Sequence, residues 1–176
     1  METKNIVYKN FNNKINLSQK KKLNKFLNIN HLIKKYPLLN SLKINYDYSF
    51  KKKELKKYKK YSEFNVIGMG GSILGSEAIY NFLNHKIKKK FYFFNNLKIQ
   101  NIRKSNKKCL NIIVSKSGNT LETISNFNLI LTKQKKNKNL IITENKKNIL
   151  RSLAHKLKSD VLDHKNYIGG RYSVLS

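Results

Sequence analysis

Residues 110–131 read LNIIVSKSGNTLETISNFNLIL, and this stretch decides the fold. Apart from Asn111, its first five residues are apolar, which is typical of a strand buried on both faces. After a polar turn, apolar residues recur at the spacing of one helical face, at Leu121, Ile124, Phe127 and Leu131. A buried strand that leads directly into an amphipathic helix is the repeating unit of a parallel α/β sheet.

The same unit recurs on both sides of this stretch. Further strands are expected at residues 64–68, 91–94, 140–143 and 160–162, and helices at residues 74–83 and 149–157. In the first of these helices Leu74, Ala78, Ile79, Phe82 and Leu83 share one face. The pattern therefore predicts an α/β domain over residues 62–176, with a parallel sheet of about five strands flanked by helices in three layers.

Residues 1–61 show a different pattern, from which we predict an N-terminal helical arm. Ser18 is a candidate N-cap, and Pro37, the only proline, would end the helix. Apolar residues at helical spacing are Leu23, Phe26, Leu27 and Ile33. The lysine-rich stretch 51–60, KKKELKKYKK, is expected to be either an exposed helix or a solvated connector.

The charge is strongly positive, because 38 Lys and Arg residues oppose 9 Asp and Glu residues and leave a formal charge of +29. Such a surplus is one signature of nucleic-acid binding. However, nearly all of it is lysine spread along the whole chain, and Asn and Ile are also abundant, as in proteins from A/T-rich genomes. We therefore expect weak, salt-sensitive attachment to polyanions and no specific nucleic-acid partner.

The remaining composition argues for a cytoplasmic protein. Cys109 is the only cysteine, so no intramolecular disulfide can form, and its apolar neighbours predict a buried thiol. Neither a signal peptide nor a membrane span is expected, because no apolar stretch approaches about 20 residues. The four histidines, at positions 31, 85, 155 and 164, lack metal-ligand spacing, and we expect structural roles for them and no metal site.

The loops that follow the strands are the places to look for chemistry, because ligands of parallel sheets bind there. Residues 68–75, GMGGSILG, form the first loop, and its glycines let the backbone approach a ligand closely. Ile73 stands where the third glycine of a dinucleotide fingerprint belongs, and Ser76 stands where a Walker loop needs lysine. The loop therefore predicts no nucleotide cofactor, and a plain tight turn without a ligand remains an alternative.

Residues 115–120, SKSGNT, form the second loop, again between a strand and a helix. Three hydroxyl groups, one ammonium group and a glycine meet at a helix N-terminus, which suits a phosphate monoester. The alternative is that Ser117 or Thr120 merely caps the helix, with Glu122 strengthening its first turn. In the third loop, residues 166–176 (NYIGGRYSVLS), a pair of glycines precedes Arg171, whose guanidinium would suit an oxyanion.

Taken in this order, GMGGSILG, SKSGNTLE and IGGRYSVLS resemble the three motifs of the first sugar-isomerase (SIS) domain of the glucose-6-phosphate isomerase family. The resemblance covers about residues 63–176. It implies that the second loop holds the phosphate of the substrate, through Ser115, Lys116, Ser117 and Thr120, with Gly118 and Asn119 completing the substrate-binding loop. Asn119 departs from the threonine that is usual in the family. The resemblance also implies that Gly71 and Ser72 touch the sugar and that Arg171 is catalytic, beside the C1 and C2 oxygens.

The reaction implied by the resemblance is the interconversion of glucose 6-phosphate and fructose 6-phosphate through an enediol, in glycolysis and gluconeogenesis, without metal or cofactor. The family's base is a glutamate, assisted by a histidine and a lysine, and all three belong to parts of the family sequence beyond Ser176. We therefore expect a fragment that lacks the following helix and the second SIS domain, that is inactive alone, and whose full-length relatives are homodimers. Two alternatives are a stand-alone sugar-phosphate-binding regulatory module and a basic nucleic-acid-binding protein.

Overall fold

The computed structural model describes residues 29–42, 45–97, 108–170 and 173. The chain divides into two compact units, residues 1–40 and 41–176, and each is described by itself. In the first unit, helix α2 (Ile29–Lys35) ends just before Pro37, which opens the 3-10 helix η1 (Pro37–Leu42). The predicted stop at Pro37 is thus confirmed, whereas Ser18, Leu23, Phe26 and Leu27 lie outside the described residues.

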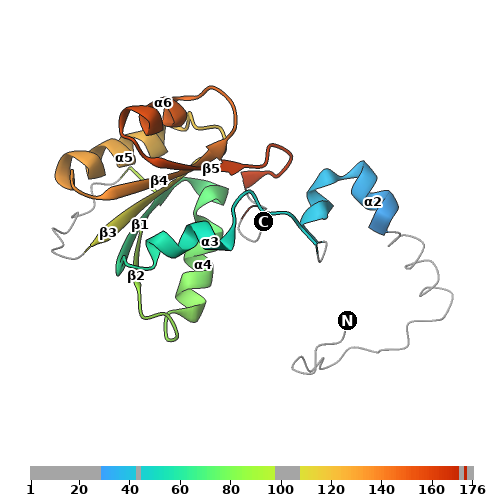
Figure 1. Ribbon diagram of the computed structural model, residues 1–176, viewed down its shortest axis with the longest axis horizontal. Coiled ribbons are helices and arrows are strands. Elements are labelled where there is room, and N and C mark those ends of the chain that lie inside the picture. Colours follow the sequence, from blue (N-terminus) through green and yellow to red (C-terminus); the bar gives the residue numbers. More distant parts are fainter. Residues whose placement is uncertain (1–28, 43–44, 98–107, 171–172, 174–176) are drawn as a thin grey trace. The chain divides into compact units, whose positions relative to one another are not determined.

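The second unit is built on five parallel strands (Figure 1). They are β1 (Glu63–Gly68), β2 (Lys90–Phe94), β3 (Cys109–Val114), β4 (Lys138–Glu144) and β5 (Asp160–His164), in the order β2-β1-β3-β4-β5. Because β1 lies between β2 and β3, the direction of winding reverses there, and the carboxyl ends of β1 and β3 flank the reversal. The predicted five-stranded parallel sheet with flanking helices is confirmed.

One face of the sheet carries the main core. Helices α5 (Leu121–Lys133) and α6 (Ile149–Lys156) cover this face. The register aligns Ile67, Ile113 and Ile141 across β1, β3 and β4, and all three side chains are fully buried. Phe127 and Ile130 of α5 and Leu150 and Ala154 of α6 pack on this row. The period-3.6 pattern of residues 121–131 thus predicted the buried face of α5.

The opposite face is covered less completely. Helix α4 (Leu74–Leu83) packs on β2 through Tyr80, whose ring centroid lies 5.1 Å from that of Phe91. The expected apolar face is not buried, since Leu74, Ile79 and Phe82 are 55%, 38% and 79% exposed, Ala78 is also exposed and Leu83 is half-buried. The helix is therefore confirmed, but the common buried face is wrong, because α4 rests on the edge strand of the sheet.

The segment before β1 forms an exposed short helix, α3 (Lys52–Leu55), and a 3-10 turn, η2 (Lys56–Tyr58). Tyr58 anchors it to the sheet, since its hydroxyl donates to Asp160 Oδ2 at 2.8 Å. As predicted, the Cys109 thiol is buried, and burial raises its pKa to about 11, with the charge of Glu63 adding to the effect. Among the described helices, none has the length and apolar character needed to cross a membrane.

Candidate functional site

The SKSGNT loop joins β3 to α5 and gathers its three hydroxyl groups into one cluster. Ser115 Oγ lies 3.0 Å from Thr120 Oγ1, and Ser117 Oγ lies 3.5 Å from the same atom. The Gly118 N–H donates to Ser115 Oγ at 3.2 Å, which closes the loop on itself. The structure therefore brings together the hydroxyl groups that the sequence assigned to phosphate binding.

No side chain caps the N-terminus of α5. Thr120 occupies the N-cap position with extended backbone angles, but its hydroxyl turns to Ser115 and makes no capping hydrogen bond. The alternative that these hydroxyls merely cap the helix is therefore wrong. By contrast, α6 is capped conventionally by Asn148, whose side-chain oxygen accepts from the Arg151 N–H at 2.9 Å. An uncapped N-terminus leaves backbone N–H groups and the positive end of the helix dipole available to an anion.

Gly118 lets the loop pass close to the start of α6. Its φ is +68°, and a Cβ at this position would lie 2.2 Å from side-chain atoms of Asn148. The Leu150 N–H donates to the Gly118 carbonyl oxygen, and the Ile149 N–H donates to Asn119 Oδ1, both at 3.0 Å. The Asn119 side chain thus ties the loop to α6, and the site needs glycine at position 118 for both conformation and space.

Neighbouring residues hold both the backbone and the side-chain ammonium group of Lys116. Its backbone carbonyl oxygen accepts from the Glu144 N–H at 3.0 Å, and its Nζ lies 3.3 Å from Glu144 Oε1. Nζ also donates to the carbonyl oxygen of Asn166 at 2.7 Å, which links the second loop to the segment before Arg171. Because an ammonium group has three N–H donors, these two contacts leave one for an anion.

Glu144 is a site residue that the sequence analysis missed. It ends β4, it is only 5% exposed, and its second carboxylate oxygen lies 2.5 Å from Lys146 Nζ. The hydrogen bond from Lys146 holds the pKa of Glu144 below its usual range, against the effect of burial, and Lys116 adds to the lowering. One sequence signal could have identified Glu144: it is a carboxylate at the carboxyl end of β4, and β4 lies next to β3, the strand that leads into the SKSGNT loop.

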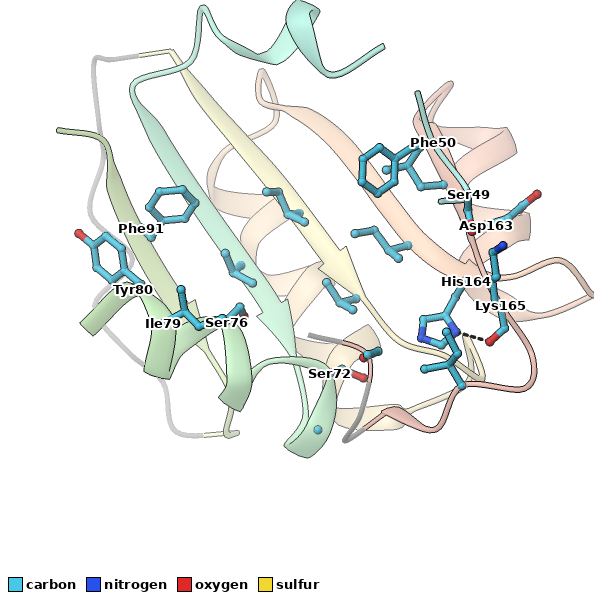
Figure 2. Close-up of a pocket in the computed structure, with 18 of the residues that line it drawn as sticks. Ser49, Phe50, Ser72, Ser76, Ile79, Tyr80, Phe91, Asp163, His164 and Lys165 are labelled. Carbon is cyan, nitrogen blue, oxygen red and sulfur yellow. Dashed lines mark hydrogen bonds between the residues drawn. The ribbon is translucent and has the colours of Figure 1, made fainter. Parts of the chain in front are cut away.

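A cavity of about 420 Å³ lies on the α4 side of the sheet, and Gly71 and Ser72 of the glycine loop line it (Figure 2). Its floor is made of apolar strand residues: Val66, Ile112, Val114, Ile142 and Leu162. Residues 115–120 do not line this cavity but begin directly after Val114. A Cβ on Gly170 would lie 3.8 Å from Ser72 Oγ, so the first and third motifs are neighbours. Arg171 itself lies outside the described residues.

His164 also lines the cavity (Figure 2), whereas the sequence predicted only a structural role for it. Its Nδ1 lies 2.9 Å from the carbonyl oxygen of Lys165, which can only accept, so Nδ1 carries the hydrogen and Nε2 is an acceptor. Burial lowers the pKa of His164, which favours the neutral ring. Of the described cavity-lining residues, Asp163 is the one carboxylate, and it pairs with the Arg151 guanidinium.

Chemically, the arrangement offers two adjoining environments. The SKSGNT loop supplies hydroxyl groups, one ammonium group and a helix N-terminus, which together suit a phosphate group. The cavity supplies an apolar floor with the Ser72 hydroxyl and the His164 imidazole at its rim. Among the described residues, no group of three His, Cys, Asp or Glu side chains could hold a metal ion.

Comparison with known proteins identifies relatives of the chain and solved structures with a similar fold. The chain is 37% identical over 133 residues to glucose-6-phosphate isomerase of Methanocaldococcus jannaschii, covering 69% of this chain but only 33% of that protein. The fold is similar to a hypothetical protein of Thermus thermophilus, with a TM-score of 0.62, 26% identity, and coverage of 70% of this chain and 34% of that one. It is also similar to tagatose-6-phosphate ketose/aldose isomerase of Escherichia coli, with a TM-score of 0.55, 16% identity, and coverage of 68% and 36%.

A family model of phosphoglucose isomerase matches residues 49–176, which are most of the chain and include all three motif loops. The chain therefore belongs to the phosphoglucose isomerase family.

Proposed function

We propose that this chain supplies the phosphate-binding and sugar-binding part of an aldose–ketose isomerase that interconverts glucose 6-phosphate and fructose 6-phosphate. The observation that carries the proposal is the hydroxyl cluster of Ser115, Ser117 and Thr120 at the uncapped N-terminus of α5. A phosphate monoester is the ligand that such a cluster, with a fixed ammonium group beside it, accommodates best.

In this proposal the phosphate occupies the SKSGNT loop, and the sugar extends toward Gly71 and Ser72. Gly118 and Asn119 act by shaping the loop against α6, since Asn119 Oδ1 accepts from the Ile149 N–H. Arg171 follows Gly170, whose Cα lies near Ser72, and its guanidinium is proposed to stabilise negative charge on the C1 and C2 oxygens. Neither a metal ion nor a nucleotide takes part.

Moving a proton between C1 and C2 also requires a base, and we propose that it comes from outside these 176 residues. Asp163 lines the cavity but is paired with Arg151, and Glu144 is held between two lysines. The lysine partners hold the pKa of Glu144 below its usual range, which makes that carboxylate a poor base. The complete enzyme is then a cytoplasmic homodimer, as the family resemblance implies, and this chain alone binds the sugar phosphate without converting it.

A second candidate function is a module that binds a sugar phosphate and never catalyses, and the engagement of Asp163 is equally compatible with it. Titration calorimetry with glucose 6-phosphate and a coupled isomerase assay separate the two. We expect binding by the 176-residue chain, no turnover, and turnover once the remaining part of a relative, such as the M. jannaschii enzyme, is supplied as a second polypeptide.

Binding without turnover in both experiments would favour the module. Failure to bind any sugar phosphate would overturn both functions. Turnover by the chain alone at about one per second or faster, within the usual enzymatic range, would show that a base lies among these residues.

A further inference from the structure

The lysines of this protein are spread along the sequence but gathered in space. Lysine-rich segments lead into four of the five strands: KKYKK (56–60), KIKKK (86–90), KQKKNK (133–138) and KLK (156–158). Lys108 directly precedes β3, the remaining strand. Because all five strands are parallel and their pairing begins within two residues of each strand's start, these segments meet at one edge of the sheet. We call it the lysine edge.

Direct contacts show that the segments of the lysine edge are neighbours. Lys89 Nζ donates to the carbonyl oxygen of Lys59 at 2.7 Å, which joins the segments before β2 and β1. Lys138 Nζ donates to the carbonyl oxygen of Lys158 at 3.3 Å, which joins the segments before β4 and β5. These contacts join the segments at the two ends of the strand order, and Lys108, which precedes the central strand, lies between them.

Little negative charge offsets the lysine edge. Among the described residues, two carboxylates lie in these segments or at the first positions of the five strands, those of Glu63 and Asp160. Glu63 is only 6% exposed, and Asp160 accepts from the Tyr58 hydroxyl and pairs with Lys57 at 3.2 Å. The opposite edge, where the strands end, carries Glu144 and Asp163, paired with Lys116 and Arg151, and further lysines at positions 146, 147 and 165. The lysine edge and the proposed sugar-phosphate site thus lie at opposite ends of the strands.

The shape and chemistry of the lysine edge fit one class of partner. Strands about 4.8 Å apart place the five segments along a row of roughly 20 Å. A nucleic-acid duplex carries one charge per about 1.7 Å, so such a row faces on the order of ten phosphates. Lysine ammonium groups act as point charges for phosphates and do not form the bidentate contacts with which arginine reads base edges. The chemistry of this edge is that of backbone binding without sequence readout.

Two observations favour a duplex over other polyanions. Tyr58 and Tyr61 are half-buried in a core cluster, and the ammonium groups of Lys57 and Lys60 lie over their rings at 5.1 and 5.5 Å. They are therefore not free platforms for the bases of a single strand. Among the exposed large hydrophobic side chains of the described residues, only Leu157, at 39%, lies in these segments, so the edge offers one apolar anchor, fewer than a membrane-binding surface needs.

We propose that the lysine edge is a second binding site, for the phosphate backbone of double-stranded nucleic acid, and that it acts independently of the sugar-phosphate site. The affinity is governed by phosphate neutralisation, so it falls steeply with salt and does not depend on base sequence.

The test measures binding of the full chain to a fluorescent 20-base-pair duplex, by anisotropy, at several salt concentrations. The edge variant is Lys88→Gln/Lys136→Gln, in which both changed lysines are exposed. The control is Lys51→Gln/Lys147→Gln, which removes the same charge from two exposed lysines outside the edge. We expect the edge variant to bind the duplex at least about threefold more weakly than the control does. The slope of log K against log salt should also become less steep by up to about 1.8, because each lost phosphate contact changes it by about 0.9.

Three further outcomes decide the proposal. Saturating glucose 6-phosphate should leave duplex binding unchanged, because the sugar-phosphate site lies at the opposite edge. Equal losses in the edge and control variants, or no duplex binding at low salt, would overturn the proposal. Tighter binding to vesicles of phosphatidylserine and phosphatidylcholine than to the duplex, with the same dependence on Lys88 and Lys136, would overturn it in favour of a membrane surface.

Discussion

The Lys116 ammonium group lies 3.3 Å from the Glu144 carboxylate, and the same two residues are joined by a hydrogen bond from the Glu144 N–H to the Lys116 carbonyl oxygen. Glu144 therefore fixes both the backbone and the charged end of the lysine that the proposed function places beside the phosphate. A lysine side chain that is already ordered loses less conformational entropy when it binds a ligand. Under the proposed function, the pair thus orders the Lys116 side chain before the substrate binds.

The first prediction concerns Lys116→Ala. We expect it to weaken binding of glucose 6-phosphate by about 1.5–3 kcal/mol, which is the usual value of a charged hydrogen bond, or about ten- to a hundredfold in affinity. Calorimetry on the full chain measures the change, and Lys147→Ala, which alters an exposed neighbouring lysine, is the control. Equal affinity before and after the Lys116 change would show that the phosphate does not bind in this loop.

The second prediction concerns Lys146, which lies 2.5 Å from Glu144 Oε2 and balances its charge. Without Lys146, the Glu144 carboxylate would neutralise Lys116 and leave the loop without net positive charge. We expect Lys146→Ala to weaken glucose 6-phosphate binding by about two- to fivefold relative to Lys147→Ala, since one charge interaction of this kind is worth up to about 1 kcal/mol. Adding Glu144→Gln to Lys146→Ala should restore part of the loss. Identical affinities for the two single variants would contradict the charge balance.

The third prediction is a pH dependence of stability that Glu144 causes. Because its lysine partners lower the pKa of Glu144 in the folded protein, the unfolded chain binds a proton more readily. The resulting stabilisation is complete above the unfolded pKa of about 4.3 and is lost as the pH falls through the lower folded value. Urea unfolding between pH 6 and pH 3 should therefore show a shallower loss of stability in Glu144→Gln than in the wild type. Glu54→Gln, which removes a carboxylate that is exposed, is the matched control for the loss of one negative charge.

The sequence predicted the fold well because each strand and helix obeyed a local rule. Buried runs such as residues 110–114 and the helical spacing of residues 121–131 require no knowledge of distant contacts. The exposure of Phe82 was not predictable in this way, because it depends on how much of the sheet α4 covers. The roles of Glu144 and His164 were missed for the same reason. Neither belongs to a local motif, and both reach the site only because parallel strands end at a common edge.

The last prediction tests how Gly118 shapes the loop, by comparing it with Gly70. Both glycines have positive φ angles, +68° and +53°, but a Cβ at Gly118 meets Asn148 at 2.2 Å, whereas a Cβ at Gly70 meets nothing within 4 Å. Gly70→Ala should therefore cost only the backbone penalty of about 1–2 kcal/mol. Gly118→Ala must in addition displace Asn148, the N-cap of α6, so we expect a total loss of about 2–4 kcal/mol.

Chemical unfolding of the two variants measures this difference, and a third variant identifies its origin. In an Asn148→Gly background, which removes the colliding side chain together with the hydrogen bonds that it donates to Thr143, Glu144 and Lys146, Gly118→Ala should cost about as much as Gly70→Ala. If Gly118→Ala remained equally costly in that background, the contact with Asn148 would not be the reason that this loop requires glycine. Glucose 6-phosphate binding should follow the same order, because the displaced side chain moves the loop on which Ser117 and Thr120 stand.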